Sequence, residues 1–199
     1  MFDTGATSSA VVLGIDPGVS RCGYGAVARA GSRLSAVSCG VIRTPPADPL
    51  PDRLAALMGE LDELVAETRP VAVAVERVLF QVNARTAMSV GQASGLALAV
   101  AGRAGVPVVQ YSPNEVKLAV AGDCGAGKEE VQVMVARLLG LGAVPRPADA
   151  ADALALAVCH WWRAPLRAAV GAGQDSSRLE AAIAAAVRRA DLPAVEDGT

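Results

Sequence analysis

The chain has 199 residues, of which 52% are hydrophobic, 3% aromatic and 19% charged. This length fits one domain with a sizeable core of small side chains, and the composition excludes disorder over most of the chain. The 18 Lys and Arg residues against 20 Asp and Glu residues give a net charge of −2. That balance does not by itself indicate a protein that binds a polyanion.

The cysteines and the termini set further limits on the class of protein. There is no Cys-x-x-Cys pair and no histidine at metal spacing from a cysteine, so we expect no structural zinc site and four buried free thiols, at Cys22, Cys39, Cys124 and Cys159. Residues 1–10 lack the basic and apolar regions of a signal peptide, and apolar runs elsewhere are interrupted before membrane-spanning length. We therefore expect a cytoplasmic protein with a disordered tail (1–10), one domain (11–164) and an Ala-rich helical or flexible extension (165–199).

The first third of the chain predicts a meander followed by a helix. The apolar run at 11–16 ends in Asp-Pro-Gly, which is typical of a buried strand and a turn, and the alternating runs at 22–29 and 34–43 complete an antiparallel meander. After a proline-rich linker, residues 52–67 form an amphipathic helix with one leucine stripe, made of Leu54, Leu57, Leu61 and Leu64.

The remainder alternates strands and helices. The uninterrupted apolar run at 71–76 is typical of a central strand covered on both faces, and 106–111 predicts another buried strand. Helices are expected at 84–104, at 128–140 after a Gly-rich loop (121–127), and at 146–162. A further helix is expected from Ser112 onward, because Pro113 and Glu115 follow this residue as in a capping box. Three strands in a row followed by this alternation indicate an α/β fold with a mixed five-stranded sheet and helices on both faces.

Four acidic residues occur in apolar or alanine-rich surroundings. Asp16 and Glu76 end two buried strands, and Asp149 and Asp152 share one face of the last helix. Each has an ordinary interpretation: Asp16 belongs to a turn motif, Glu76 could pair with Arg77, and carboxylates favour a helix N-terminus. Together, four unpaired carboxylates in apolar surroundings would cost free energy of folding unless a positively charged group binds them.

A divalent cation is the most economical partner for these acids, because their flanking segments contain only Arg77 as a nearby base. Oxygen ligands favour Mg²⁺ or Mn²⁺ over zinc, and four carboxylates can hold the two ions used in phosphodiester hydrolysis. No Ser–His or Cys–His arrangement competes, because the only histidine, His160, lies deep in the last helix, where we expect it in the core.

Five short motifs now become informative, and they occur in order over residues 11–162: GIDPG (14–18), AVERV (74–78), GQASGLAL (91–98), NEVK (114–117) and PADAADALALAVCH (147–160). They resemble the Holliday junction resolvase RuvC family. The resemblance implies a ribonuclease H-like fold of the retroviral integrase superfamily and a homodimer that nicks four-way DNA junctions symmetrically in recombination and repair. It also implies two Mg²⁺ ions per active site, with Mn²⁺ as a substitute, and work alongside the RuvA–RuvB branch-migration complex.

Matching these motifs residue by residue assigns roles to individual side chains. The metal-binding and catalytic acids of the family fall on Asp16, Glu76, Asp149 and Asp152. Two catalytic basic residues that face the scissile phosphate fall on Lys117 and Lys128, the only two lysines beside 16 arginines. A plain surface role for either lysine stays open, and Glu129 and Glu130 weaken the positive field beside Lys128.

The segment after Glu76 is expected to contact DNA through Arg77, Leu79, Phe80 and Arg85. The family typically has an aromatic residue at the position of Leu79, which is thought to wedge into the junction. Here either Leu79 or its neighbour Phe80 could serve, since apolar side chains also insert at distorted base steps. Core packing of Phe80 is the alternative, and the helix 84–104 is a candidate for both core and dimer packing.

Three other functions compete with the resolvase. A different ribonuclease H-like nuclease would act on RNA–DNA hybrids or other branched DNA, but the PADAADALA helix preceded by NEVK favours the resolvase. An actin-like kinase or ATPase needs a second phosphate loop, which is not evident. A module that binds junctions without cutting them would not need all four acids.

The metal acids also change the meaning of the net charge. Residues 1–164 contain 14 basic and 15 acidic side chains. Without the four acids that would bind metal, 11 acidic side chains remain, which leaves an excess of three positive charges. The expected molecule is a modestly basic body with an acidic metal pocket, whose DNA binding depends on junction shape and weakens with salt.

Overall fold

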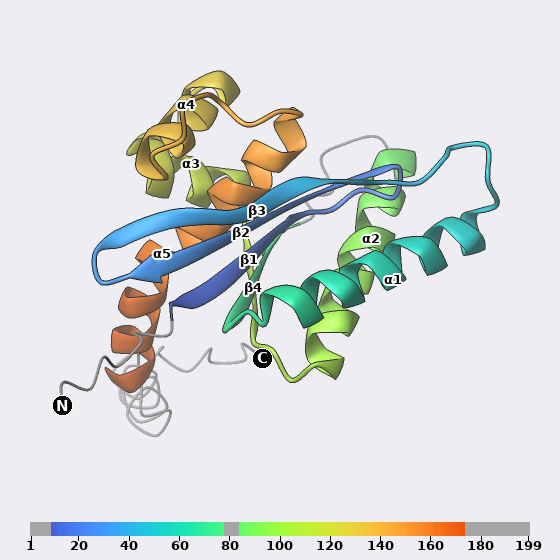
Figure 1. Cartoon of the computed structure of the whole chain (residues 1–199), viewed down its shortest axis with the longest axis horizontal. Coiled ribbons are helices and arrows are strands. Elements are labelled where there is room, and N and C mark those ends of the chain that lie inside the picture. Colours follow the sequence, from blue (N-terminus) through green and yellow to red (C-terminus); the bar gives the residue numbers. More distant parts are fainter. Residues whose placement is uncertain (1–8, 78–83, 174–199) are drawn as a thin grey trace, which may run out of the picture. The chain divides into compact units, whose positions relative to one another are not determined.

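The structure, a computed structural model, describes residues 9–77 and 84–173. These residues form one sheet with the strand order β3-β2-β1-β4-β5 and helices on its faces (Figure 1). The strands are β1 (Ala10–Asp16), β2 (Arg21–Ala30), β3 (Arg33–Arg43), β4 (Ala72–Glu76) and β5 (Val108–Tyr111). The helices are α1 (Leu50–Thr68), α2 (Ala84–Arg103), α3 (Pro113–Ala121), α4 (Lys128–Leu138) and α5 (Ala148–Gly173).

The chain divides into two compact units, at residues 1–162 and 163–199, and the sheet lies in the first. The predicted tail (1–10) and extension (165–199) fall largely outside the described residues. Those two parts of the domain prediction remain predictions.

The sheet is mixed, as the element order predicts. β1, β2 and β3 pair antiparallel, whereas β1 pairs parallel with β4 and β4 pairs parallel with β5. In the β1–β4 ladder Ile15 lies opposite Val75, so the residues that follow, Asp16 and Glu76, leave the sheet at the same edge. The last strand is shorter and less buried than predicted, because β5 is an edge strand in which Tyr111 alone is fully buried.

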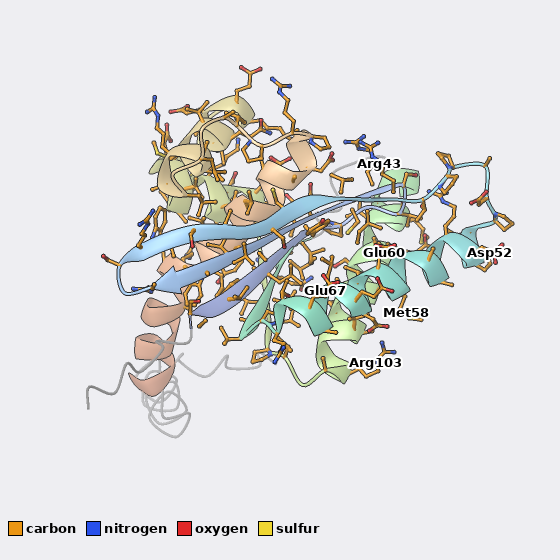
Figure 2. The ribbon with its side chains drawn as sticks, viewed as in Figure 1. Arg43, Asp52, Met58, Glu60, Glu67 and Arg103 are labelled. Atoms are coloured by element: carbon orange, nitrogen blue, oxygen red, sulfur yellow. The ribbon has the colours of Figure 1, made fainter. Side chains whose placement is uncertain are left out.

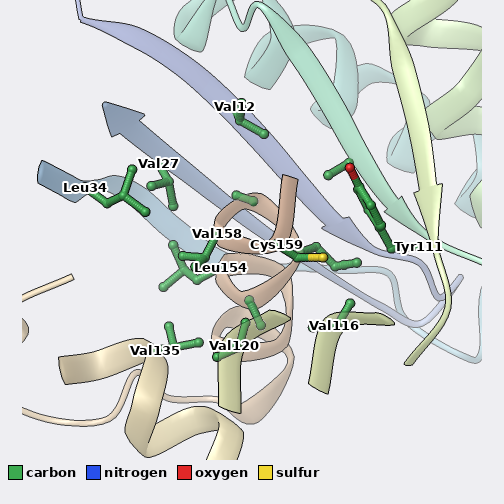
Figure 3. Packing of buried hydrophobic residues seen from close by; sticks show 14 of the residues in the cluster. Val12, Val27, Leu34, Tyr111, Val116, Val120, Val135, Leu154, Val158 and Cys159 are labelled. Atoms are coloured by element: carbon green, nitrogen blue, oxygen red, sulfur yellow. The ribbon is translucent and has the colours of Figure 1, made fainter. Parts of the chain in front are cut away.

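Two apolar layers cover the central strands, which explains their uninterrupted apolar sequences. Leu13 and Ile15 of β1 pack with Leu57 and Leu61 of α1, while the preceding Val12 packs on the opposite face. Figure 1 shows α1 and α2 on one side of the sheet and α3 and α4 on the other. Figure 3 shows the second layer, in which side chains from α3, α4 and α5 meet those of the sheet.

Glycines in β1 and β2 allow α5 to approach the sheet unusually closely. A Cβ at Gly14 would lie 1.9 Å from the carbonyl oxygen of Ala153, and one at Gly23 would lie 2.2 Å from that of Asp149. The facing side of α5 is alanine-rich and fully buried around Ala153. This contact places the first turns of α5 directly beside the end of β1.

Helix ends agree with the sequence signals to within a few residues, except at the C-terminal end of α5, which was expected at residue 162 and lies at Gly173. Ser112 and Glu115 form a complete capping box at the start of α3. The last helix begins at Ala148, two residues later than predicted, because Pro147 and Arg146 belong to the preceding loop. Among the described helices, none is long and apolar enough to cross a bilayer.

The cysteine prediction is half wrong. All four thiols are free, and Cys22 and Cys159 are buried, but Cys39 and Cys124 are exposed. Cys39 lies on β3, an edge strand whose side chains alternate between the layer and solvent, and Cys124 lies in the loop after α3. The expectation treated cysteine only as a small apolar residue.

Candidate active site

The ends of β1 and β4 bring two carboxyl groups into contact. Asp16 and Glu76 share a side-chain hydrogen bond, and both are partly shielded from solvent. Burial, with the negative charges of Glu76 and Asp152, raises the pKa of Asp16 to about 8. Burial also raises the pKa of Glu76 above its ordinary value. At neutral pH the pair therefore holds a proton.

The two acids of α5 are instead paired with bases from other elements. Arg21, the first residue of β2, donates from Nε to Asp149 Oδ2 over 3.2 Å, and its Nη2 forms an ion pair with the same oxygen. Lys128, the first residue of α4, lies with Nζ 2.6 Å from Asp152 Oδ2. Gln132 Nε2 donates to Asp152 Oδ1 over 3.2 Å.

These pairs shift the pKa values of their members. Burial works to raise the pKa of Asp149, but the hydrogen bond and charge of Arg21 and the charge of Lys128 outweigh it, so the pKa lies below its ordinary value. The hydrogen bond to Asp152 raises the pKa of Lys128. Asp149 is thus ionised, in contrast to Asp16.

The expectation that only Arg77 could neutralise the acids is wrong. Arg21 and Lys128 reach them from 128 and 24 residues away in sequence, because β2 and α4 both flank the start of α5. Nor does Arg77 pair with Glu76: its Nη2 donates to the Gln110 carbonyl over 3.1 Å. Its Nη1 lies 3.9 Å from Glu115 Oε2.

A cleft of about 250 Å³ opens beside these groups. It is lined by three of the four acids, both lysines of the chain and apolar residues of α3, α4 and α5: Asp16, Glu76, Asp152, Lys117, Lys128, Pro113, Val116, Val131, Ala155 and Leu156. Asp149 does not line it, but its charge reaches Asp16. The structure thus brings three of the predicted acids and both predicted lysines around one cleft, with Asp149 close beside it.

The donor set of this cleft suits a hard divalent cation. The side chains that could bind one are carboxylates, and two of them are forced to share a proton by burial and mutual repulsion. Over residues 9–77 and 84–173, however, no three acidic, histidine or cysteine groups are close enough to hold a metal ion as they stand. Arg21 and Lys128 hold the two α5 carboxylates in their present positions.

Other predicted DNA contacts are less complete. Arg77 is about half exposed at the end of β4. Leu79 and Phe80 lie outside the described residues, and Arg85 lies in the first turn of α2 with its side chain also outside them. The structure therefore does not test the choice between Leu79 and Phe80. His160 is buried, as expected, with Nδ1 3.1 Å from Tyr111 Oη.

Sequence reasoning missed Arg21 and Gln132. Arg21 follows Asp16 by five residues, and the meander alone implies that the start of β2 lies beside the end of β1. That signal could have placed Arg21 near the site, whereas its pairing with Asp149 depends on how α5 docks. The sequence gives no indication of the role of Gln132, because one polar residue in an amphipathic helix is ordinary.

Comparison with known proteins decides the family. A family model described as Crossover junction endodeoxyribonuclease RuvC matches residues 12–160. The chain is also 53% identical over 170 residues to the crossover junction endodeoxyribonuclease RuvC of Frankia alni, covering 83% of this chain and 86% of the relative. The chain belongs to the RuvC family. The predicted family and the predicted enzyme class, an endodeoxyribonuclease, are confirmed.

Solved RuvC structures agree with the fold. Thermus thermophilus RuvC in complex with a Holliday junction substrate is 41% identical, with a TM-score of 0.75 over 79% of this chain and 96% of that one. The yeast mitochondrial Holliday junction resolvase shares the fold at 16% identity, with a TM-score of 0.54 over 79% of this chain and 81% of the other. The predicted ribonuclease H-like fold is confirmed, and the span matched to the RuvC family contains Arg21, both lysines and all four acids.

Proposed function

We propose that this chain resolves four-way DNA junctions by paired symmetric nicks during recombination and repair, in a reaction that depends on Mg²⁺. One observation carries the proposal: carboxylates from β1, β4 and α5 and the only two lysines of the chain meet around a single cleft. Acids for hard cations and point charges for a phosphate are the two parts that metal-assisted phosphodiester hydrolysis needs.

Each group has a role in this proposal. Two Mg²⁺ ions, or Mn²⁺ in their place, would be held by Asp16, Glu76, Asp149 and Asp152, and when bound they supply an activated water and charge stabilisation at the leaving oxygen. Lys117 and Lys128 orient the scissile phosphate and stabilise charge that develops on it. The products are 5′-phosphate and 3′-hydroxyl ends, which suit ligation. Arg77, Arg85 and either Leu79 or Phe80 contact the junction beyond this phosphate.

Two sites are needed for paired nicks, so we propose a homodimer that works with the RuvA–RuvB complex. α2 is the candidate interface. Ala93 and Ala97 bury one side of this helix against the sheet, while Gly95 and Met88, which is 66% exposed, lie on the other. Small residues of this kind permit close approach of a second helix.

A panel of DNA substrates tests the function. Mobile and immobile four-way junctions, a linear duplex and an RNA–DNA hybrid are incubated with the protein and Mg²⁺, and nicks are mapped on denaturing gels. We expect symmetric nicks in the junctions alone. Cleavage of the hybrid but not of the junctions would contradict the proposal and favour another ribonuclease H-like nuclease.

The Asp16→Asn variant separates a nuclease from a binding module. It keeps the shape of the side chain but removes a charge that the cations need, so nicking should fall below detection while junction binding, measured by gel shift, persists. Unchanged nicking in this variant would remove Asp16 from the site.

A further inference from the structure

Arg21 holds one of the four acids through a contact that family-level reasoning did not anticipate. Both Nε and Nη2 of its guanidinium bind the same atom, Asp149 Oδ2. The side chain of Arg21 is 42% exposed and that of Asp149 is 27% exposed, so the pair lies at the surface rather than in the core. The close contact between Gly23 and the Asp149 backbone fixes the distance between β2 and this turn of α5.

In this arrangement Arg21 competes with a divalent cation for Asp149. A positive charge bound to a carboxylate oxygen competes for that oxygen with a divalent ion and repels the ion as well. Lys128 does the same at Asp152, but it lines the cleft in which the scissile phosphate is expected, whereas Arg21 does not. An ion that takes Oδ2 of Asp149 therefore leaves Arg21, already partly exposed, without its present acceptor.

We propose that Arg21 is an additional DNA-phosphate ligand, which Asp149 holds until a divalent cation takes that carboxylate. Cation binding then releases a guanidinium at the edge of the site, where its fork matches two phosphate oxygens. The inference rests on the proposed function, because it requires that DNA lie across the site. Its consequence is a coupling in which cation and DNA strengthen each other's binding through Arg21.

Calcium binding with and without DNA measures this coupling, with Ca²⁺ as a probe that need not support cleavage. Calorimetry gives the Ca²⁺ affinity of the protein alone, and fluorescence anisotropy gives the junction affinity with and without Ca²⁺. The variants are Arg21→Ala, Arg21→Lys and, as a matched control, Arg103→Ala. Arg103, the last residue of α2 (labelled in Figure 2), forms an exposed ion pair with Asp62 of α1, so its loss changes the net charge equally.

Arg21→Ala should bind Ca²⁺ about two- to fivefold more tightly than the unmodified protein, the range that one exposed ion pair accounts for. The increase in junction affinity on adding Ca²⁺ should shrink by a similar factor. Arg21→Lys should keep Ca²⁺ affinity near the original value and recover part of the increase, because it keeps the charge but loses the fork. Arg103→Ala should match the unmodified protein in both measurements.

Two results overturn the proposal. Calcium binding that is unchanged or weaker in Arg21→Ala means that Arg21 supports Asp149 instead of competing for it. An undiminished effect of Ca²⁺ on junction affinity means that Arg21 does not reach DNA. Circular dichroism melts check that Arg21→Ala folds, and Arg21→Lys carries the test if it does not.

If the proposed function itself is wrong, the experiment gives a different result from these two. In that case the unmodified protein does not prefer a junction to a linear duplex in the presence of Ca²⁺. The calorimetric comparison without DNA still reports whether Arg21 and the cation compete for Asp149.

Discussion

Asp16 and Glu76 illustrate how neighbouring parallel strands create an unusual pair of acids. Their backbones leave the sheet side by side, which places the two carboxyl groups within hydrogen-bonding reach of each other. In water both would be ionised at neutral pH, but here burial and repulsion keep a proton between them. Any cation that binds must therefore displace a proton, which makes cation affinity rise with pH.

The same proton makes the stability of the metal-free protein depend on pH. The pKa of Asp16 is about 8 in the folded state against 3.8 ordinarily, so between these values the native state binds more protons than the unfolded chain. Stability from this group is complete below pH 3.8 and is lost as pH rises toward about 8. Chemical denaturation in chelator across this range should show less decline for Asp16→Asn than for the unmodified protein. Parallel curves for the two proteins would contradict the shift.

At this scale, sequence predicts which acids gather at the cleft better than it predicts their partners. Asp16 and Glu76 could be identified because each ends an apolar strand, and Asp149 and Asp152 because an i, i+3 spacing shares a helix face. Arg21 and Lys128 could not be paired with particular acids, since those contacts form only when α5 and α4 dock beside the sheet. Nothing in a linear pattern encodes that docking.

The close packing of α5 on β1 and β2 is the element-level feature that assembles the site. Helices usually pack through side-chain layers, but here glycines in the strands and alanines in the helix bring the backbones together. The GIDPG and PADAADALA motifs thus have a packing role besides their acids. Gly14 and Ala153 contribute no chemistry, yet they determine where Asp149 and Asp152 lie.

Replacing Gly14 tests this packing. A Cβ there would approach the Ala153 carbonyl oxygen to 1.9 Å, so Gly14→Ala should cost about 2–3 kcal/mol or more and weaken Ca²⁺ binding as α5 shifts. The control is Gly59→Ala at an exposed position of α1, where nothing lies within 4 Å and removal of a helix-interior glycine should stabilise by about 0.5–1 kcal/mol. Urea denaturation gives both values. Equal tolerance of the two alanines would contradict the close approach.

Elements were predictable where one physical rule dominated. The leucine stripe of α1 and the capping box before α3 gave the right helices, and alternation gave the meander. The burial of β5 was overestimated, because an apolar sequence cannot tell an edge strand from a central one. The predicted burial of Cys39 and Cys124 was wrong for a related reason: their position in the sheet or loop, not their residue type, determines their exposure.

For the whole molecule, the charged side chains divide into an acidic site and a weakly basic remainder. Four acids belong to the candidate site, and the rest of residues 1–164 has three more basic than acidic side chains. This small excess is unlike the strongly basic surface of a non-specific DNA-binding protein. Selectivity for junctions over linear DNA should then depend on the arrangement of two sites rather than on total charge.

Salt dependence of junction binding measures that balance. Raising monovalent salt from about 50 to about 200 mM in the presence of Ca²⁺ should weaken junction binding by about 10- to 100-fold, with a linear relation between the logarithms of affinity and salt concentration. Fluorescence anisotropy with a labelled junction provides the data, and a linear duplex of the same length is the control. A junction affinity that does not change with salt concentration would rule out phosphate contacts as a main contribution to binding.

The four acids also lie far apart along the chain, on β1, β4 and α5. A growing polypeptide that ends before residue 149 has at most Asp16 and Glu76, with neither the partner acids nor the helix that seals the sheet behind them. Because α5 supplies both the remaining acids and much of one apolar layer, completion of the fold and assembly of the site are the same event. A nascent chain that ends before residue 149 therefore lacks half of the acids that the proposed site needs.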